Sequence, residues 1–144
     1  MERIGGIQMK KVALFLLVVV FIAACGKGSY KDLRGVMEEF LTAQEAYVEG
    51  MESVQTADDL AATMNNFADA IEKIGPKMKE MTEKYPEIMK ENEMPEALKD
   101  LDERGKALQT RMQNLSQDKF NEFISDDKVL EAAQRMGKAF QSMM

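Results

Sequence analysis

The chain has 144 residues, a single cysteine, no histidine and a formal net charge of −6. These counts exclude an intramolecular disulfide, Ser-His-Asp catalysis and a histidine-ligated zinc site. An acidic chain without a basic stripe is also a poor ligand for a phosphate backbone, so we expect no nucleic-acid partner.

The N-terminal part of the sequence has the pattern of an export signal. Lys10 and Lys11 precede an uninterrupted apolar run over residues 12–24, which ends at Cys25. Such a run reaches about 20 Å as a helix, which is short of the roughly 30 Å hydrocarbon core of a bilayer. The pattern therefore predicts a signal peptide over residues 1–24 rather than a membrane-spanning helix, with the mature protein beginning at Cys25.

The first eight residues fit a signal peptide poorly, because Glu2 adds negative charge before the apolar run. A second methionine, Met9, directly precedes Lys10 and Lys11. The consecutive codons of Gly5-Gly6, just upstream, can form a purine-rich ribosome-binding site. We therefore expect translation to begin at Met9.

The residues that close the apolar run, Ile22-Ala23-Ala24-Cys25, resemble the lipobox of bacterial lipoproteins. The resemblance covers residues 10–25. It implies that Cys25 receives a diacylglycerol, that signal peptidase II cleaves before it, and that the new amino group is acylated, for example with palmitate. Several acyl chains hold a protein on a bilayer far longer than one chain does. The resemblance thus implies a membrane-anchored protein of the cell envelope.

In the same class of proteins, an aspartate directly after the lipidated cysteine commonly retains the protein in the inner membrane. This sequence has Gly26 there, which favours the outer membrane, facing the periplasm, if the source is diderm. Residues 25–29 comprise Cys25 and the tether Gly26-Lys27-Gly28-Ser29, whose flexible reach of about 11 Å keeps the folded domain close to the lipid.

Residues 30–144 are expected to form one domain with a single core. The first 24 residues hold three basic and one acidic side chain, so the mature chain has 16 basic and 24 acidic ones and a formal charge of −8.

Helical periodicity of the apolar residues begins at Tyr30 and continues to about Val54, which predicts a first amphipathic helix. Thr56 is the expected N-cap of a second helix, whose apolar stripe extends to Ile74. Gly75-Pro76 then supplies either a stop or a kink. Between Pro76 and Pro95 we expect one or two short helical pieces with bends at the prolines.

Pro95 is expected to be the first residue of a third long helix, whose apolar stripe ends near Leu115. A fourth helical pattern runs from Phe120 to Phe140, and the sequence leaves open whether Ser125 breaks it or bends it. No strand pattern of useful length follows Cys25. We therefore predict an all-α, antiparallel helical bundle of about four helices with a proline-bounded irregular segment. A long helical hairpin that dimerises would use the same stripes, so the oligomeric state stays open.

Methionines form the one cluster of soft ligands in the mature chain. Met78, Met81 and Met89 lie in the proline-bounded segment, and clustered thioethers can bind Cu(I). Methionine is also an unbranched core residue that helices tolerate well, so core packing is the favoured interpretation. An adaptable apolar surface for partner helices is a third interpretation. We assign no cofactor and keep these three methionines as the alternative metal site.

Two glycines fall on apolar stripes of predicted helices. Gly50 and Gly105 indicate either a close approach of two backbones or a groove for an apolar ligand, and close packing is favoured. The segment from Asp100 to Gly105 begins like a calcium loop, but Arg104 occupies a position that needs an oxygen ligand, so we discard calcium binding. Three acid–base pairs at i,i+4 spacing are expected on a solvated helix face: Glu80–Lys84, Asp100–Arg104 and Asp102–Lys106.

No set of residues in the sequence specifies a reaction, so we assign no catalytic residue and expect a protein that is not an enzyme. We expect a lipid-anchored envelope lipoprotein that binds another envelope component through its helical domain. The alternative is a carrier of a small ligand or Cu(I), using a bundle groove or the methionine cluster. An enzyme built from carboxylates alone is the third class.

Overall fold

The computed structural model describes residues 30–86, 88, 94–115 and 117–144. The predicted signal peptide, the candidate lipidation site Cys25, the tether and Met89 lie outside the described residues. Within the described residues the chain forms helices and turns and no strand, which confirms the predicted all-α class. The elements are α2 (Lys31–Ser53), α3 (Ala57–Lys84), the 3-10 turn η1 (Glu96–Leu98), α4 (Lys99–Gln113), α5 (Gln117–Phe123) and α6 (Asp127–Gln141).

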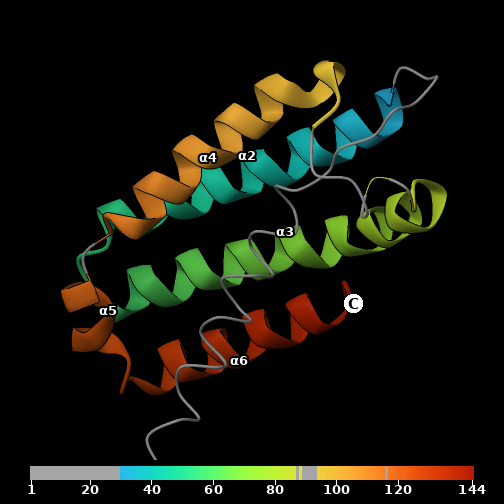
Figure 1. Ribbon diagram of the computed structural model, residues 1–144. Helices are drawn as coiled ribbons and strands as arrows, with labels where there is room; N and C mark the ends of the chain where they lie inside the picture. The colour runs from blue at the N-terminus through green and yellow to red at the C-terminus, as the bar shows by residue number, and fades with distance from the viewer. Residues whose placement is uncertain (1–29, 87, 89–93, 116) are drawn as a thin grey trace, which may run out of the picture.

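The helices are arranged around a central hairpin of α2 and α3. Helix α4 packs along α2, and α6 packs along α3, so that α4 and α6 lie on opposite sides of the hairpin (Figure 1). This arrangement confirms the predicted helical bundle of about four helices. The α2–α3 pair is antiparallel, because Lys77 of α3 contacts Glu39 near the start of α2.

The two outer pairs of helices run parallel, which differs from a purely antiparallel bundle. Residues early in α2 meet residues early in α4, as in Arg34 with Asp100, and late residues meet late residues, as in Glu52 with Arg111. The same order holds for α3 and α6. There, Asp58 meets Lys128 near the two N-termini and Glu72 meets Arg135 further along.

Local capping signals define where α3 and α6 begin. The Thr56 hydroxyl accepts a hydrogen bond from the Asp59 N–H at 3.1 Å, and the Asp59 carboxylate accepts one from the Thr56 N–H at 3.0 Å. This capping box confirms the predicted N-cap. Asp126 caps α6 by accepting from the Lys128 N–H, so the fourth helical pattern is broken into α5 and α6 rather than bent.

The region between the prolines differs from the expectation. Helix α3 continues through Pro76 to Lys84, so Gly75-Pro76 is not a stop, one of the two alternatives for it, and the separate short helix expected after Pro76 is wrong for residues 76–84. Ile74 and Gly75 before the proline and Met81 after it are buried, and this packing on both sides offsets the helix hydrogen bond that Pro76 cannot donate. Pro95 precedes η1 as its cap, with α4 following at Lys99, rather than opening a long α-helix itself.

The core consists of two clusters of buried apolar side chains. The larger one joins α2, α3 and α4 to Ile88 and to Ala139 of α6, with Phe40 and Ile71 almost fully buried. The smaller one lies where α6 begins and includes Leu60 and Val129. Three rings connect the hairpin to α6, because Phe67 stacks on Tyr47 at 4.7 Å and lies 5.8 Å from Phe140 between ring centroids.

Candidate functional site

The methionines of the alternative metal site contribute to the core. Met81 is buried, Met78 packs against the larger cluster, and Met94 does the same. Met89 lies outside the described residues. The positions of Met78 and Met81 therefore agree with core packing, which was the favoured interpretation.

Gly50 lies at a close contact between α2 and α3. A Cβ atom at this position would meet Cγ2 of Thr63 at 2.7 Å and its hydroxyl oxygen at 2.9 Å, so the space beside the glycine is already filled. Gly105 is buried in α4. Close packing, rather than a groove, accounts for Gly50.

Arginine–carboxylate pairs hold α4 along α2. Arg34 donates to both carboxylate oxygens of Asp100, at 2.8 and 2.5 Å, and to the carbonyl oxygen of Ala97. Arg104 pairs with Glu45, and seven residues later Arg111 pairs with Glu52 at 2.8 Å. Bidentate pairs of this kind fix the register of two helices more than they add stability, since their side chains remain partly exposed.

These contacts correct two of the three pairs expected along single helices. Asp102 does pair with Lys106, at 2.5 Å. Asp100 and Arg104 do not pair with each other, because each finds a partner on α2. Lys84 likewise pairs with Asp32 of α2 instead of with Glu80.

Asp32 forms the most strongly shifted ionisable site among the described residues. Its carboxylate accepts hydrogen bonds from the Lys84 ammonium and from the Tyr85 hydroxyl, the latter at 2.6 Å. These bonds hold the pKa of Asp32 well below its usual range, with the Lys84 bond as the largest cause. The same contacts raise the pKa values of Lys84 and Tyr85. The Asp32 carboxylate therefore stays charged, and its hydrogen bonds to Lys84 and Tyr85 link α2 to the end of α3.

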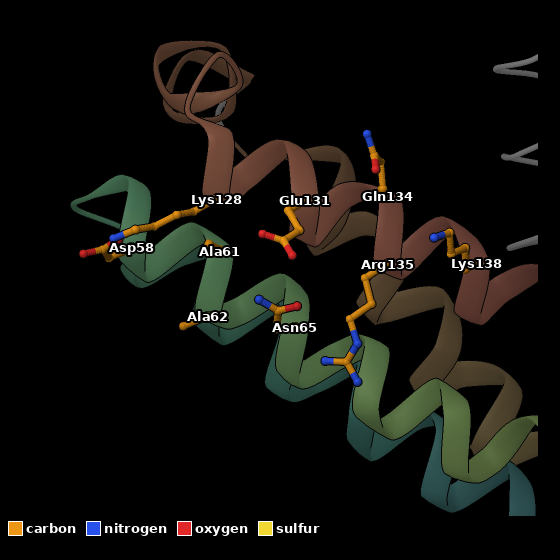
Figure 2. Close-up of a pocket in the computed structure, with 9 residues that line it drawn as sticks. All are labelled: Asp58, Ala61, Ala62, Asn65, Lys128, Glu131, Gln134, Arg135 and Lys138. Carbon is orange, nitrogen blue, oxygen red and sulfur yellow. The ribbon is translucent and has the colours of Figure 1, made fainter.

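A polar groove of about 670 Å³ lies between α3 and α6 (Figure 2). Lys128 reaches across to Asp58 near one end, and the Arg135 guanidinium pairs with Asp69 and Glu72 of α3. Its lining residues are Asp58, Ala61, Ala62, Asn65, Lys128, Glu131, Gln134, Arg135 and Lys138.

The groove offers polar contacts without an apolar anchor. Asn65 and Glu131 point toward the space between the helices, whereas Gln134 points away from it (Figure 2). The apolar lining consists of two alanines, so a ligand there would gain little burial energy. The sequence analysis did not single out the polar lining residues of this groove. They lie on polar helix faces, and their spacing matches no known motif.

A second hollow, of about 310 Å³, lies at the end of the bundle that contains the α2–α3 turn and α5. Val54 and Leu60 line it but are almost fully buried, with exposed fractions of 1% and 0%, so the apolar side chains that it exposes are those of Met51, Leu115 and Phe120. Its lining residues are Met51, Glu52, Val54, Leu60, Arg111, Asn114, Leu115 and Phe120. No local sequence pattern predicts this hollow, since residues of four separate helices contribute to it.

Within the described part of the chain, no group of three or more Cys, His, Asp or Glu side chains is placed to hold a metal ion. None of the helices that the structure describes combines the length and the apolar composition needed to cross a membrane. Comparisons with protein-family models, curated proteins and solved structures give no match. The functional assignment therefore depends on the chain's own residues.

Proposed function

We propose that the chain is a lipid-anchored lipoprotein of a bacterial envelope, with a helical domain that binds another envelope component and performs no catalysis. One observation carries the proposal: Lys10 and Lys11, an apolar run and Ile22-Ala23-Ala24-Cys25 follow one another in the order of a lipoprotein signal. Cys25 is the residue that would carry the acyl chains. The only cysteine of the chain thereby has a role that needs no disulfide partner.

The start of the folded domain supports an anchor at this position. Helix α2 begins at Lys31, six residues after Cys25. Six residues of random coil would reach only about 12–15 Å, so the start of α2 would remain close to the lipid headgroups. Because α2 has 23 residues, the other end of the bundle would lie up to about 35 Å further along the helix axis.

The ionisable groups favour binding over catalysis. Among the described residues, the carboxyl groups with a clear shift are Asp32, Glu45, Asp59 and Asp100, and in each of them the pKa is lowered by hydrogen bonds from a neighbouring side chain or backbone N–H. A carboxyl group that acts as a general acid near neutral pH needs a raised pKa instead. These four carboxylates thus serve as fixed charges of ion pairs and of a helix cap.

The carrier alternative has less support. Met81 is buried in the core, and the space beside Gly50 is filled by Thr63, so these two residues offer no open site to a ligand. The polar groove between α3 and α6 is open but lacks apolar anchors. We therefore place the carrier role second.

The anchor is tested by expressing the full chain in a diderm bacterial host and measuring the intact mass of the membrane-extracted protein. We expect a chain that begins at Cys25 and carries the added mass of a diacylglycerol and an acyl group. Cys25→Ser should abolish acylation, whereas Gly26→Ser, a matched change one residue away, should not. An unmodified Cys25 or a retained signal peptide would refute the anchor.

The same host tests the location. Fractionation of the two membranes should find the wild-type protein in the outer membrane, and Gly26→Asp should move it to the inner one. If the wild-type protein and Gly26→Asp were distributed between the two membranes in the same way, Gly26 would not determine the location.

A further inference from the structure

The end of the bundle opposite the start of α2 concentrates exposed apolar side chains. We call it the distal end and define it as residues 51–60 and 111–131, which include the α2–α3 turn, α5 and the first turn of α6 (Figure 1). Ile124 and Leu130 lie there, with exposed fractions of 39% and 43%. The third large exposed apolar side chain of the described residues, Met144, lies at the C-terminus, near the opposite end. The hollow lined by Val54, Leu60 and Phe120 belongs to the distal end as well.

The hollow has the size and lining of an anchor site for one or two side chains. Its volume of about 310 Å³ is at the lower end of the range of roughly 300–1,000 Å³ for ligand pockets. Met51, Leu115 and Phe120 supply partly exposed apolar lining, and the Glu52–Arg111 ion pair lines the hollow as well. An inserted leucine or phenylalanine would bury apolar surface there, which is how hot-spot residues anchor an interface.

The distal end also carries most of the negative charge of the mature chain. It contains eight acidic and three basic residues, so its formal charge is −5, out of −8 from Cys25 onward. Two of its bases are already neutralised, because Arg111 pairs with Glu52 and Lys128 pairs with Asp58. Four exposed acids form no ion pair with a described residue: Asp59, which caps α3, and Glu122, Asp127 and Glu131.

This charge distinguishes between the occupants that such a surface could have. A second copy packed symmetrically would bring two surfaces of charge −5 together, and like charges across an interface are repelled. An anionic lipid surface would be repelled in the same way. A cationic protein segment is attracted by the exposed acids and can place an apolar side chain in the hollow.

We propose that the distal end is a docking site for a cationic, amphipathic segment of another envelope protein. A large apolar side chain of that segment occupies the hollow between α2, α3, α4 and α5. Its lysines or arginines face the exposed acids Glu122 of α5 and Asp127 of the first turn of α6. The inference rests on the proposed function for its orientation, since the anchor at Cys25 would point the distal end away from the membrane toward a partner.

The test uses the mature, membrane-extracted protein in phosphatidylcholine nanodiscs, with empty nanodiscs as the blank. The probe is a synthetic hexapeptide with Leu-Phe at its centre and two lysines on each side, and the control probe has glutamates in place of the lysines. Binding is measured by calorimetry and by amide chemical shifts of the ¹⁵N-labelled protein. We expect the lysine peptide alone to bind, with the shift changes concentrated in residues 51–60 and 111–131, and its affinity to fall as salt rises.

Matched variants separate this site from general attraction to an acidic protein. Ile124→Ser, Leu130→Ser and Glu122→Lys should each weaken the lysine peptide, together by at least about tenfold. Met144→Ser and Glu83→Lys change an exposed apolar residue and an exposed acid outside the distal end, and should leave the affinity unchanged. All five positions are exposed, so the variants are expected to fold, which circular dichroism checks.

Three results would overturn the proposal. In the first, the distal variants bind the peptide as the wild-type protein does. In the second, the protein forms a dimer that Leu130→Ser abolishes, which would make a second copy the occupant. In the third, phosphatidylglycerol vesicles bind to the distal end in place of the peptide. A missing acyl group on Cys25 would refute the anchor without changing the peptide affinity, so the two proposals fail separately.

Discussion

Gly50 is the residue at which the contact between α2 and α3 leaves no room for a side chain. The nearest atoms to a Cβ built there belong to Thr63, a β-branched residue with restricted rotamers. Gly35 lies in the same helix, but a Cβ atom at that position would meet nothing within 4 Å. The two glycines therefore share a helix and differ only in what surrounds them.

We expect Gly50→Ala to lower the free energy of unfolding by about 1–2 kcal/mol, because the strain of overpacking, about 1–3 kcal/mol, exceeds the gain in helix propensity. Gly35→Ala, as the matched control, should raise it by about 0.5–1 kcal/mol. Urea denaturation measures both. If Gly50→Ala stabilised the protein as much as the control, the contact with Thr63 would have to be looser than the structure indicates.

Among the elements, the start of α3 could be predicted, whereas the start of α4 and the pairing of helices could not. The cap at Thr56 and the apolar stripes are encoded within a few residues, so the sequence alone identified them. Lys84 has Glu80 one turn before it, yet it pairs with Asp32, which is 52 residues away in the chain. Which residue faces which across two helices depends on their rotation and neighbours, and no local pattern records this.

The same distinction applies to the candidate sites. The resemblance to a lipobox could be recognised because its residues are consecutive, whereas the hollow at the distal end requires residues from α2 to α5 to be brought together. At Pro76 a local pattern was misleading. Proline disfavours the interior of a helix, but α3 continues through Pro76 because the residues on both sides of it are packed in the core.

Thr56→Ala tests the contribution of the capping box to α3. It removes a hydrogen-bond acceptor from the first turn, and we expect the free energy of unfolding to fall by about 1 kcal/mol. Thr82→Ala is a matched control in the same helix, since the Thr82 hydroxyl only bonds back to the Met78 carbonyl oxygen. Thermal unfolding followed by circular dichroism compares them, and equal melting temperatures would argue against the cap.

For the whole molecule, charge pairs connect every pair of neighbouring long helices. Asp32 joins α2 to the end of α3, Glu45 and Asp100 join α2 to α4, and Asp58 joins α3 to α6. For Asp32, Glu45 and Asp100 the pKa is lowered in the folded state. A lowered pKa means that the charged form stabilises the fold at pH values above the unfolded pKa of about 4, and that this stabilisation is lost as the pH falls further.

We therefore expect the free energy of unfolding to decrease as the pH falls below about 4, and Asp32→Asn to change this profile. The variant should be less stable than the wild-type protein at pH 7, and the difference should narrow in acid, where the wild-type carboxylate becomes protonated. Glu83→Gln, which alters an exposed acid without an ion pair to a described residue, is the control. Urea denaturation at several pH values measures the profiles, and a constant difference between the Asp32 variant and the wild type would contradict the assignment.

The parallel pairing of the outer helices has a consequence for the order of folding. Glu45 and Arg104 are 59 residues apart in the chain, and Asp58 and Lys128 are 70 apart, so only the α2–α3 hairpin can form from neighbouring segments. Contacts between distant segments require large loops to close first. Folding is therefore expected to be slower than in a bundle where each helix packs against the next one in the chain. Helix α6, which packs along α3, is synthesised after the other helices that the structure describes. Until α6 is made, the apolar residues of α3 that it covers remain open to water, and the newly made chain is most exposed to aggregation.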